Sequence, residues 1–200
     1  MPEAAVEGFE APTWDYLYEL CIVLADLVRA SEYKPDILVG VARGGWIPAR
    51  LLSDFLENPN MANVKVEFYL DINKTAHDPV ITQPVSVPVA GKRVLIVDDV
   101  ADSGKSLKLV KESLQAQGAA EVRVACAYYK PWSILKPDYY AKETRGWVIF
   151  PHEVKETVRK VCEKLRGEGR SIKDVKAELV RIGLKPLTVE KFVREICEGK

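Results

Sequence analysis

The sequence predicts an α/β protein with a mostly parallel central sheet, flanking helices and a helical appendage at the C-terminus. Two observations carry this prediction. Short apolar runs at residues 36–41 and 94–97 have the pattern of strands buried on both faces, and each run precedes a segment with helical spacing. Alternation of strands with helices is typical of parallel sheets, which bind ligands at the carboxyl ends of their strands.

The first predicted elements are a helix, a strand and a second helix, after a loose segment over residues 1–11. The first helix is expected from Trp14 to about Ala30, with Thr13 as its cap and a stripe of leucines along one face. The strand at 36–41 is expected to lead into a helix over 46–56. A proline in the first turn of that helix is tolerated, because the N–H groups there have no intrahelical acceptor.

The middle of the chain alternates between strand and loop patterns. Residues 64–70 alternate between apolar and polar types and predict a strand with one exposed face. Residues 71–84 contain prolines and lack a clear period, so they predict a long loop, part of it extended.

The strand at 94–97 is expected to lead through a turn into a helix that begins near Ser106 and stops at Gly118. Residues 121–129 predict another strand. Together these elements predict an α/β domain that precedes the C-terminal helices.

Residues 154–200 predict a helical extension. The first helix is expected over residues 153–166. The second is expected to begin at the Ser171–Asp174 capping box and to end at Gly183 and Pro186. Thr188 is expected to cap a third helix. The extension is too short to bury a strong core alone, so we expect it to dock on the main domain or on a partner subunit. A helix-turn-helix that binds nucleic acid is a disfavoured alternative, because the chain has no net charge.

The composition favours a cytoplasmic protein that binds small anions. Lys plus Arg and Asp plus Glu each number 29, which predicts no binding to nucleic acid or to acidic membranes. The four cysteines have no Cys-x-x-Cys spacing and are expected to be reduced, and two histidines argue against a zinc site. The sequence shows neither a signal peptide nor a run long enough to span a bilayer.

Carboxylates and a phosphate-binding turn meet at the end of the strand at 94–97. Asp98 and Asp99 follow the strand, and Asp102 precedes the turn Ser103-Gly104-Lys105-Ser106. Such a turn at a helix N-terminus presents backbone N–H groups to a phosphate. Because carboxylates would repel a bare anion, the pattern predicts a phosphorylated sugar together with Mg²⁺.

Two other interpretations of this segment are weaker. A nucleoside-triphosphate phosphate loop requires a glycine where this chain has Asp99, so that motif is absent. An ordinary capped helix with solvated aspartates is also conceivable, but three carboxylates at one strand end carry desolvation and repulsion costs.

The segment Val94–Ser106 resembles the ribose-phosphate signature of type I phosphoribosyltransferases, and the resemblance extends over roughly residues 12–153. It implies that Ser103 to Ser106 hold the 5′-phosphate of phosphoribosyl pyrophosphate, and that Asp98 and Asp99 serve the ribose hydroxyls and Mg²⁺. It also implies that Asp102 contacts or deprotonates the purine base.

A second strand–helix junction, Arg43-Gly44-Gly45, resembles the pyrophosphate loop of the same family. Arginine and glycine N–H groups there would neutralise the leaving pyrophosphate, so we assign Arg43 a catalytic role and Gly44 and Gly45 a binding role. A surface arginine beside a glycine turn is the alternative.

Three further residues resemble the base-binding segments of 6-oxopurine phosphoribosyltransferases. Lys130 would donate to the exocyclic oxygen of the base, Trp147 would stack on the ring, and the backbone of Val148 would read the base edge. Glu153 resembles an acidic residue that helps to hold Mg²⁺, whereas His152 stands where an aromatic is expected. A core tryptophan and a solvated lysine are the alternatives for Trp147 and Lys130.

The sequence therefore predicts a Mg²⁺-dependent purine phosphoribosyltransferase that forms a nucleoside monophosphate, such as GMP or IMP, in purine salvage. We expect a homodimer or a higher homo-oligomer. One alternative is the same reaction with adenine or a pyrimidine. Another is a regulator that binds phosphoribosyl pyrophosphate without catalysis.

Overall fold

The computed structural model describes residues 8–69 and 78–198, and its contacts divide the chain into two compact units. One unit is Leu17–Thr144, and the other combines Met1–Tyr16 with Arg145–Lys200. This grouping places residues 145–153 with the C-terminal helices. The predicted domain limits, 12–153 and 154–200, follow from family resemblance and stay a prediction.

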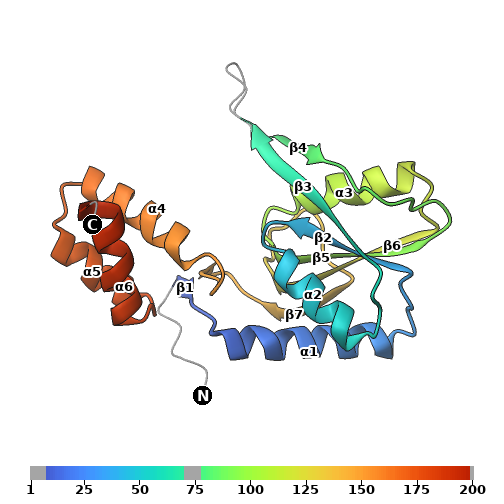
Figure 1. Cartoon of the computed structure of the whole chain (residues 1–200), viewed down its shortest axis with the longest axis horizontal. Coiled ribbons are helices and arrows are strands. Elements are labelled where there is room, and N and C mark those ends of the chain that lie inside the picture. Colours follow the sequence, from blue (N-terminus) through green and yellow to red (C-terminus); the bar gives the residue numbers. More distant parts are fainter. Residues whose placement is uncertain (1–7, 70–77, 199–200) are drawn as a thin grey trace. The chain divides into compact units, whose positions relative to one another are not determined.

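The Leu17–Thr144 unit is built on a six-stranded sheet (Figure 1). Its strands are arranged in the order β4-β3-β2-β5-β6-β7, and every neighbouring pair is parallel except β3 with β4. The bounds are β2 (Ile37–Ala42), β3 (Met61–Tyr69), β4 (Asp78–Gln83), β5 (Arg93–Ala101), β6 (Glu121–Tyr129) and β7 (Tyr139–Glu143). The predicted α/β class with a mostly parallel sheet is confirmed.

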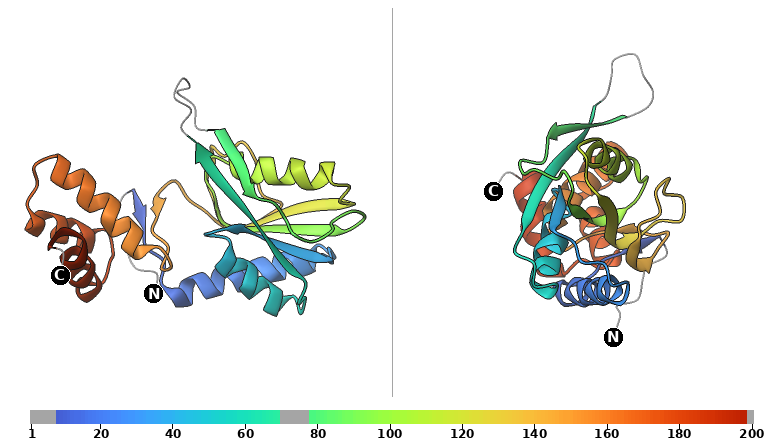
Figure 2. Two further views of the ribbon diagram at one scale, coloured as in Figure 1. Left: turned by 45° about the horizontal axis from the view of Figure 1, so that its top comes forward. Right: turned by 90° about the vertical axis from the view of Figure 1, so that its right-hand side faces the viewer.

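Three helices flank this sheet, with α3 (Lys105–Ala116) on one face and α1 (Trp14–Ala30) and α2 (Trp46–Phe55) on the other (Figure 2). The cap predicted for α1 is present, since the Tyr16 N–H donates to Oγ1 of Thr13 over 3.1 Å. The four residues Val94–Val97 at the centre of β5 are completely buried, as expected for a strand covered on both faces.

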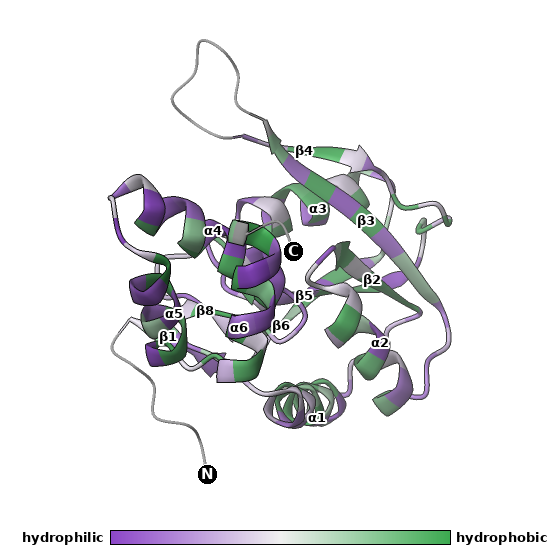
Figure 3. Cartoon of the chain, turned by 60° about the vertical axis from the view of Figure 1, so that its left-hand side comes forward, coloured by the Kyte–Doolittle hydropathy of each residue, from purple (hydrophilic) through white to green (hydrophobic). Residues whose placement is uncertain are grey.

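Two strands of the sheet depart from the sequence prediction. Residues 78–83, predicted as part of a loop, form the edge strand β4, where prolines are tolerated because one side of an edge strand makes no ladder hydrogen bonds. β7 was not predicted, since Tyr139–Glu143 lacks an apolar run. Lys74 and Thr75, which the family resemblance offers in place of the Ser-Tyr pair of some relatives' lid loops, lie outside the described residues. β3 begins three residues earlier than expected and alternates between hydrophobic and hydrophilic residues (Figure 3).

The second unit pairs two short parallel strands and adds helices from the C-terminal part of the chain. Its elements are β1 (Phe9–Glu10), β8 (Trp147–Val148), α4 (Val154–Gly167), α5 (Ile172–Arg181), α6 (Pro186–Val193) and a π-helical turn (Arg194–Glu198). The helices bury a core of their own, to which Ile149 and the N-terminal residues Phe9 and Ala11 contribute. The expected docking of the extension on the main domain or on a partner subunit stays a prediction.

The capping box of Ser171 and Asp174 is present, but the start of the last helix differs from the prediction. Pro186 begins α6 instead of ending the preceding helix, and Thr188 lies inside α6 instead of capping it. The first helical position suits proline, whose fixed backbone angle matches the helix and whose missing N–H is not needed there. Within residues 8–69 and 78–198, every helix is too short or too polar to span a membrane.

Candidate functional site

The turn predicted to bind a phosphate lies between β5 and α3. β5 continues through both aspartates to Ala101, so the turn itself is shorter than expected and α3 begins at Lys105. Gly104 caps the helix with a left-handed φ of 75°, a conformation that favours glycine. The hydroxyl oxygen of Ser103 accepts the Lys105 N–H over 3.4 Å, and Ser106 lies in the first turn of α3. The N–H groups at the N-terminus of a helix can bind an anion, so the predicted phosphate site stays compatible with this geometry.

Asp98 and Asp99 lie at the carboxyl end of β5 with different surroundings. Asp98 is in register with Cys126 of β6, and its Oδ1 accepts the backbone N–H of Asp99 over 3.0 Å. Asp99 is 8 % exposed and its carboxylate lies against Gly44. The two carboxyl groups also interact with each other, since a side-chain hydrogen bond and charge repulsion from Asp99 both act on Asp98.

The pKa of Asp98 lies well above its usual range. Burial is the main cause, and the neighbouring Asp99 carboxylate adds to it. The thiol of Cys126 has a raised pKa for the same reasons, burial first and then the negative charges of Asp98 and Asp99. A bound cation would relieve the repulsion between the two neighbouring carboxyl groups.

The loop that follows β2 lies directly beside these carboxylates. A Cβ at Gly44 would overlap the Asp99 carboxylate, with 2.5 Å to its Cγ, and a Cβ at Gly45 would lie 2.7 Å from the Val41 carbonyl oxygen. The peptide bond between Ala42 and Arg43 is cis, and the Arg43 side chain is exposed. Glycine at position 44 therefore allows the predicted pyrophosphate loop to contact Asp99, and glycine at position 45 allows its close packing on the β2 and β5 backbones.

The segment that follows β6 lies against the β5–α3 turn. The Lys130 N–H donates to the Ala101 carbonyl oxygen and the Ile134 N–H donates to that of Ser103, both over 3.0 Å. A Cβ at Gly104 would overlap the Ser133 hydroxyl, so the glycine also permits this close contact. Lys130 is 5 % exposed, which is unusual for a lysine.

Trp132 is a site residue that sequence reasoning missed. Its indole Nε1–H donates to Oδ1 of Asp102 over 2.9 Å, and the ammonium of Lys130 lies 5.1 Å from its ring centroid. In the sequence, this tryptophan follows Pro131 in a segment without helix or strand periodicity. Its position two residues after Lys130 was the only feature that could have indicated a place in the site.

The structure thus brings together three loops, which follow β2, β5 and β6 at the carboxyl ends of adjacent parallel strands. Nearly all the predicted site residues belong to the Leu17–Thr144 unit. Trp147, Val148 and Glu153 belong to the other unit, where Trp147 is 54 % exposed, Val148 is buried and Glu153 precedes α4. Their part in the site stays a prediction.

The donor set fits a Mg²⁺ ion that is shared with a substrate. Within the described ranges, no three acidic, histidine or cysteine side chains gather into a metal-binding group. Mg²⁺ commonly binds through one or two carboxylates plus water and substrate phosphate oxygens. Asp98 and Asp99 could supply those carboxylates, and a diphosphate the remaining oxygens.

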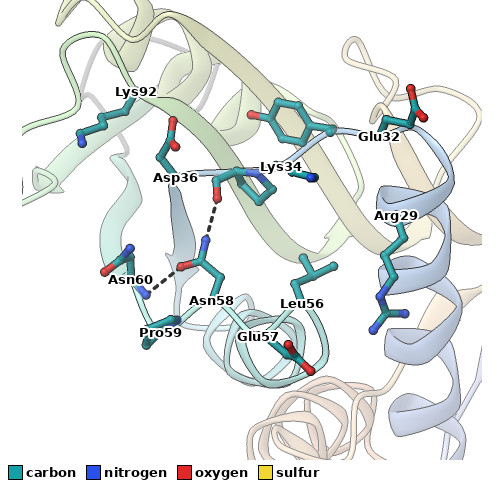
Figure 4. Close-up of a pocket in the computed structure, with 12 residues that line it drawn as sticks. Arg29, Glu32, Lys34, Asp36, Leu56, Glu57, Asn58, Pro59, Asn60 and Lys92 are labelled. Carbon is teal, nitrogen blue, oxygen red and sulfur yellow. Dashed lines mark hydrogen bonds between the residues drawn. The ribbon is translucent and has the colours of Figure 1, made fainter.

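A pocket of about 680 Å³ lies at the amino ends of β2, β3 and β5, at the other end of the strands from these loops (Figure 4). Its polar groups hold the loops together. Nδ2 of Asn58 donates to the Pro35 carbonyl oxygen over 2.7 Å. Asp36 also forms an ion pair over 3.0 Å with Arg93, which lies outside the pocket lining. We assign this end of the sheet a structural role.

Comparison with known proteins identifies the family of the chain. The sequence profile of the phosphoribosyl transferase domain matches residues 14–159. A xanthine-guanine phosphoribosyltransferase from Gluconobacter oxydans is 32 % identical over 141 residues, which are 70 % of this chain and 81 % of that protein. A hypoxanthine-guanine phosphoribosyltransferase from Saccharomyces cerevisiae is 28 % identical over 131 residues, 56 % of this chain and 57 % of the yeast protein.

A solved structure shows the same relationship. The purine phosphoribosyltransferase from Pyrococcus horikoshii superposes with a TM-score of 0.66 at 42 % identity, covering 72 % of this chain and 93 % of that one. The sequence match extends over more than half of the chain and includes the β2 loop, the aspartate pair and the β5–α3 turn. This chain belongs to the phosphoribosyl transferase domain family.

Proposed function

We propose that the protein transfers the phosphoribosyl group of phosphoribosyl pyrophosphate to a 6-oxopurine, releasing pyrophosphate and a nucleoside 5′-monophosphate in purine salvage. The observation that carries the proposal is the meeting of three loops: a helix N-terminus for phosphate, the Asp99 carboxylate against Gly44, and a buried lysine beside Asp102. The curated relatives named above are enzymes of this activity.

In this proposal the turn from Ser103 to Ser106 binds the 5′-phosphate, and Asp98 and Asp99 bind the ribose hydroxyls. The exposed guanidinium of Arg43, with the N–H groups of Gly44 and Gly45, binds the pyrophosphate. Mg²⁺, held by Asp98, Asp99 and the diphosphate, would neutralise the charge of the leaving group. Glu153 is a proposed further ligand.

Asp102 would accept the proton of the attacking ring nitrogen. General base catalysis of this kind is worth roughly 10²–10⁴-fold in rate. Lys130 would donate to the exocyclic oxygen of hypoxanthine, guanine or xanthine, whereas the amino group of adenine would face it donor to donor. Trp147 and the backbone of Val148 would complete the base site. A homo-oligomer and a cytoplasmic location stay predictions.

A panel assay tests the function. Pyrophosphate release would be measured with phosphoribosyl pyrophosphate and each of guanine, hypoxanthine, xanthine, adenine and uracil, with Mg²⁺ and with excess chelator. Turnover of at least one 6-oxopurine far above adenine and uracil, lost with the chelator, is the expected result. A preference for adenine or uracil would show that the protein uses a base other than a 6-oxopurine. Binding of phosphoribosyl pyrophosphate without turnover would indicate a regulator.

A further inference from the structure

Trp132 contacts the carboxylate that the proposed function uses as a base. Its indole Nε1–H donates to Oδ1 of Asp102 over 2.9 Å. Both side chains are exposed, Trp132 by 51 %, so an accidental surface contact is the alternative that has to be excluded.

The backbone around the two residues argues against an accidental contact. The Lys130 N–H donates to the carbonyl oxygen of Ala101, immediately before Asp102, and the Ile134 N–H donates to that of Ser103, immediately after it. Backbone hydrogen bonds thus join segment 130–134 to segment 101–103 on both sides of Asp102. The hydrogen bond from Trp132 to Asp102 lies between these two backbone bonds and joins the middle residues of the two segments. The backbone holds Trp132 where its N–H reaches Asp102.

The same indole also contacts the lysine proposed to recognise the base. The Lys130 ammonium lies 5.1 Å from the ring centroid, within the range of a cation–π interaction. One exposed ring therefore links the proposed base-reading ammonium with the proposed proton acceptor, and either group would be displaced if the ring moved.

We propose that Trp132 is a positioning residue for the transfer reaction, an inference that rests on the proposed function. By engaging Oδ1, the indole N–H orients the Asp102 carboxylate so that Oδ2 faces the purine. In the reaction, the purine nitrogen forms its bond to the anomeric carbon while the carbon–oxygen bond to pyrophosphate breaks, and the electron pair leaves with pyrophosphate. The nitrogen-bound proton passes to Oδ2 of Asp102.

The substitution Trp132→Phe tests this role, because it removes the N–H donor and keeps an aromatic ring beside Lys130. We expect kcat with hypoxanthine or guanine to fall about tenfold, the effect of losing a hydrogen bond to a charged group in the reacting state. KM for phosphoribosyl pyrophosphate should stay within about twofold, since the donor that is lost engages Asp102 and not the proposed phosphate turn. Tyr18→Phe is the matched control, since it also removes one polar hydrogen from an exposed aromatic side chain, which packs on Phe55, and it should leave both constants unchanged.

A double-mutant cycle with Asp102→Asn separates positioning from a general loss of structure. If Trp132 acts through Asp102, Trp132→Phe should slow the wild type but have almost no further effect on the Asp102→Asn variant. Equal effects in both backgrounds would overturn the inference, and so would an active wild type that Trp132→Phe leaves unchanged. A wild-type chain inactive with every base would overturn the proposed function and this inference with it.

Discussion

Gly44 packs against Asp99 so closely that a Cβ at position 44 would overlap the Asp99 carboxylate. The contact joins the loop after β2 to the carboxyl end of β5. It couples the two halves of the proposed substrate site, because the residue that would hold pyrophosphate touches a residue that would hold ribose and Mg²⁺.

Gly44→Ala should therefore displace either the Asp99 carboxylate or the β2 loop. We expect KM for phosphoribosyl pyrophosphate to rise about tenfold or more, since sub-ångström misplacement of binding groups is costly. Steady-state kinetics with phosphoribosyl pyrophosphate as the varied substrate measures the effect. Gly167→Ala is the matched control, because a Cβ at Gly167 meets nothing within 4 Å. Equal KM values for the two variants would contradict the coupling.

We expect Asp98 to lower the stability of the ligand-free protein, as a consequence of its proposed role in ligand binding. Its raised pKa means that the folded protein disfavours the charged form. Asp98→Asn should raise the Tm of the ligand-free protein by roughly 2–4 °C, the effect of about 1 kcal/mol in a chain of this size, while turnover falls. Calorimetry and the pyrophosphate assay measure the two effects.

The pH dependence of the Asp98 effect has a defined sign. A carboxyl with a raised folded pKa binds its proton more tightly in the folded state, so the stability of the wild type should decrease as pH rises from the unfolded pKa, about 4, toward the folded value. Asp98→Asn should weaken this decrease. If its Tm is lower than that of the wild type at every pH, Asp98 does not destabilise the fold.

Asp36 lies at the amino end of the sheet strands and, in contrast to Asp98, should stabilise the fold. Hydrogen bonds from the Arg93 side chain and backbone lower the pKa of Asp36 to about 2. Its stabilising effect is complete above the unfolded pKa, about 4, and disappears as pH falls toward 2. Asp36→Asn should lower Tm at pH 7 with little change in kcat, and the difference in Tm should vanish near pH 2. A large loss of kcat would show that this end of the sheet has a part in catalysis.

Lys130 is predicted to select the base. Lys130→Met keeps a long unbranched side chain and removes the ammonium donor, so turnover of guanine relative to adenine should fall about tenfold to a hundredfold. Lys108→Met, at an exposed position of α3, is the control. The ratio of kcat/KM values for the two bases is the measurement, and an unchanged ratio would refute the role of Lys130.

Features encoded in adjacent residues were predicted well. The helix over Trp14–Ala30 and the strand over Glu121–Tyr129 have the predicted bounds, because each carries its hydrophobic pattern and its stop signal locally. The aspartate pair and the following turn were found for the same reason. β4 was missed because an edge strand tolerates the prolines that usually indicate a loop.

Features that depend on distant segments could not be predicted from the sequence. The contact of Gly44 with Asp99 and that of Trp132 with Asp102 each join loops that follow different strands. The alternation of strands and helices in the sequence predicts that these loops lie at one edge of the sheet. It does not predict which of their side chains contact each other. Trp132 has no local pattern that distinguishes it from any other surface tryptophan.

The most direct test is a crystal structure of the protein with Mg²⁺ and phosphoribosyl pyrophosphate. The account predicts the 5′-phosphate on the N–H groups of residues 103–106, the ribose hydroxyls at Asp98 and Asp99, and the diphosphate against Arg43 and Gly44. Phosphoribosyl pyrophosphate bound elsewhere, with the β5–α3 turn empty and both aspartates facing solvent, would contradict it.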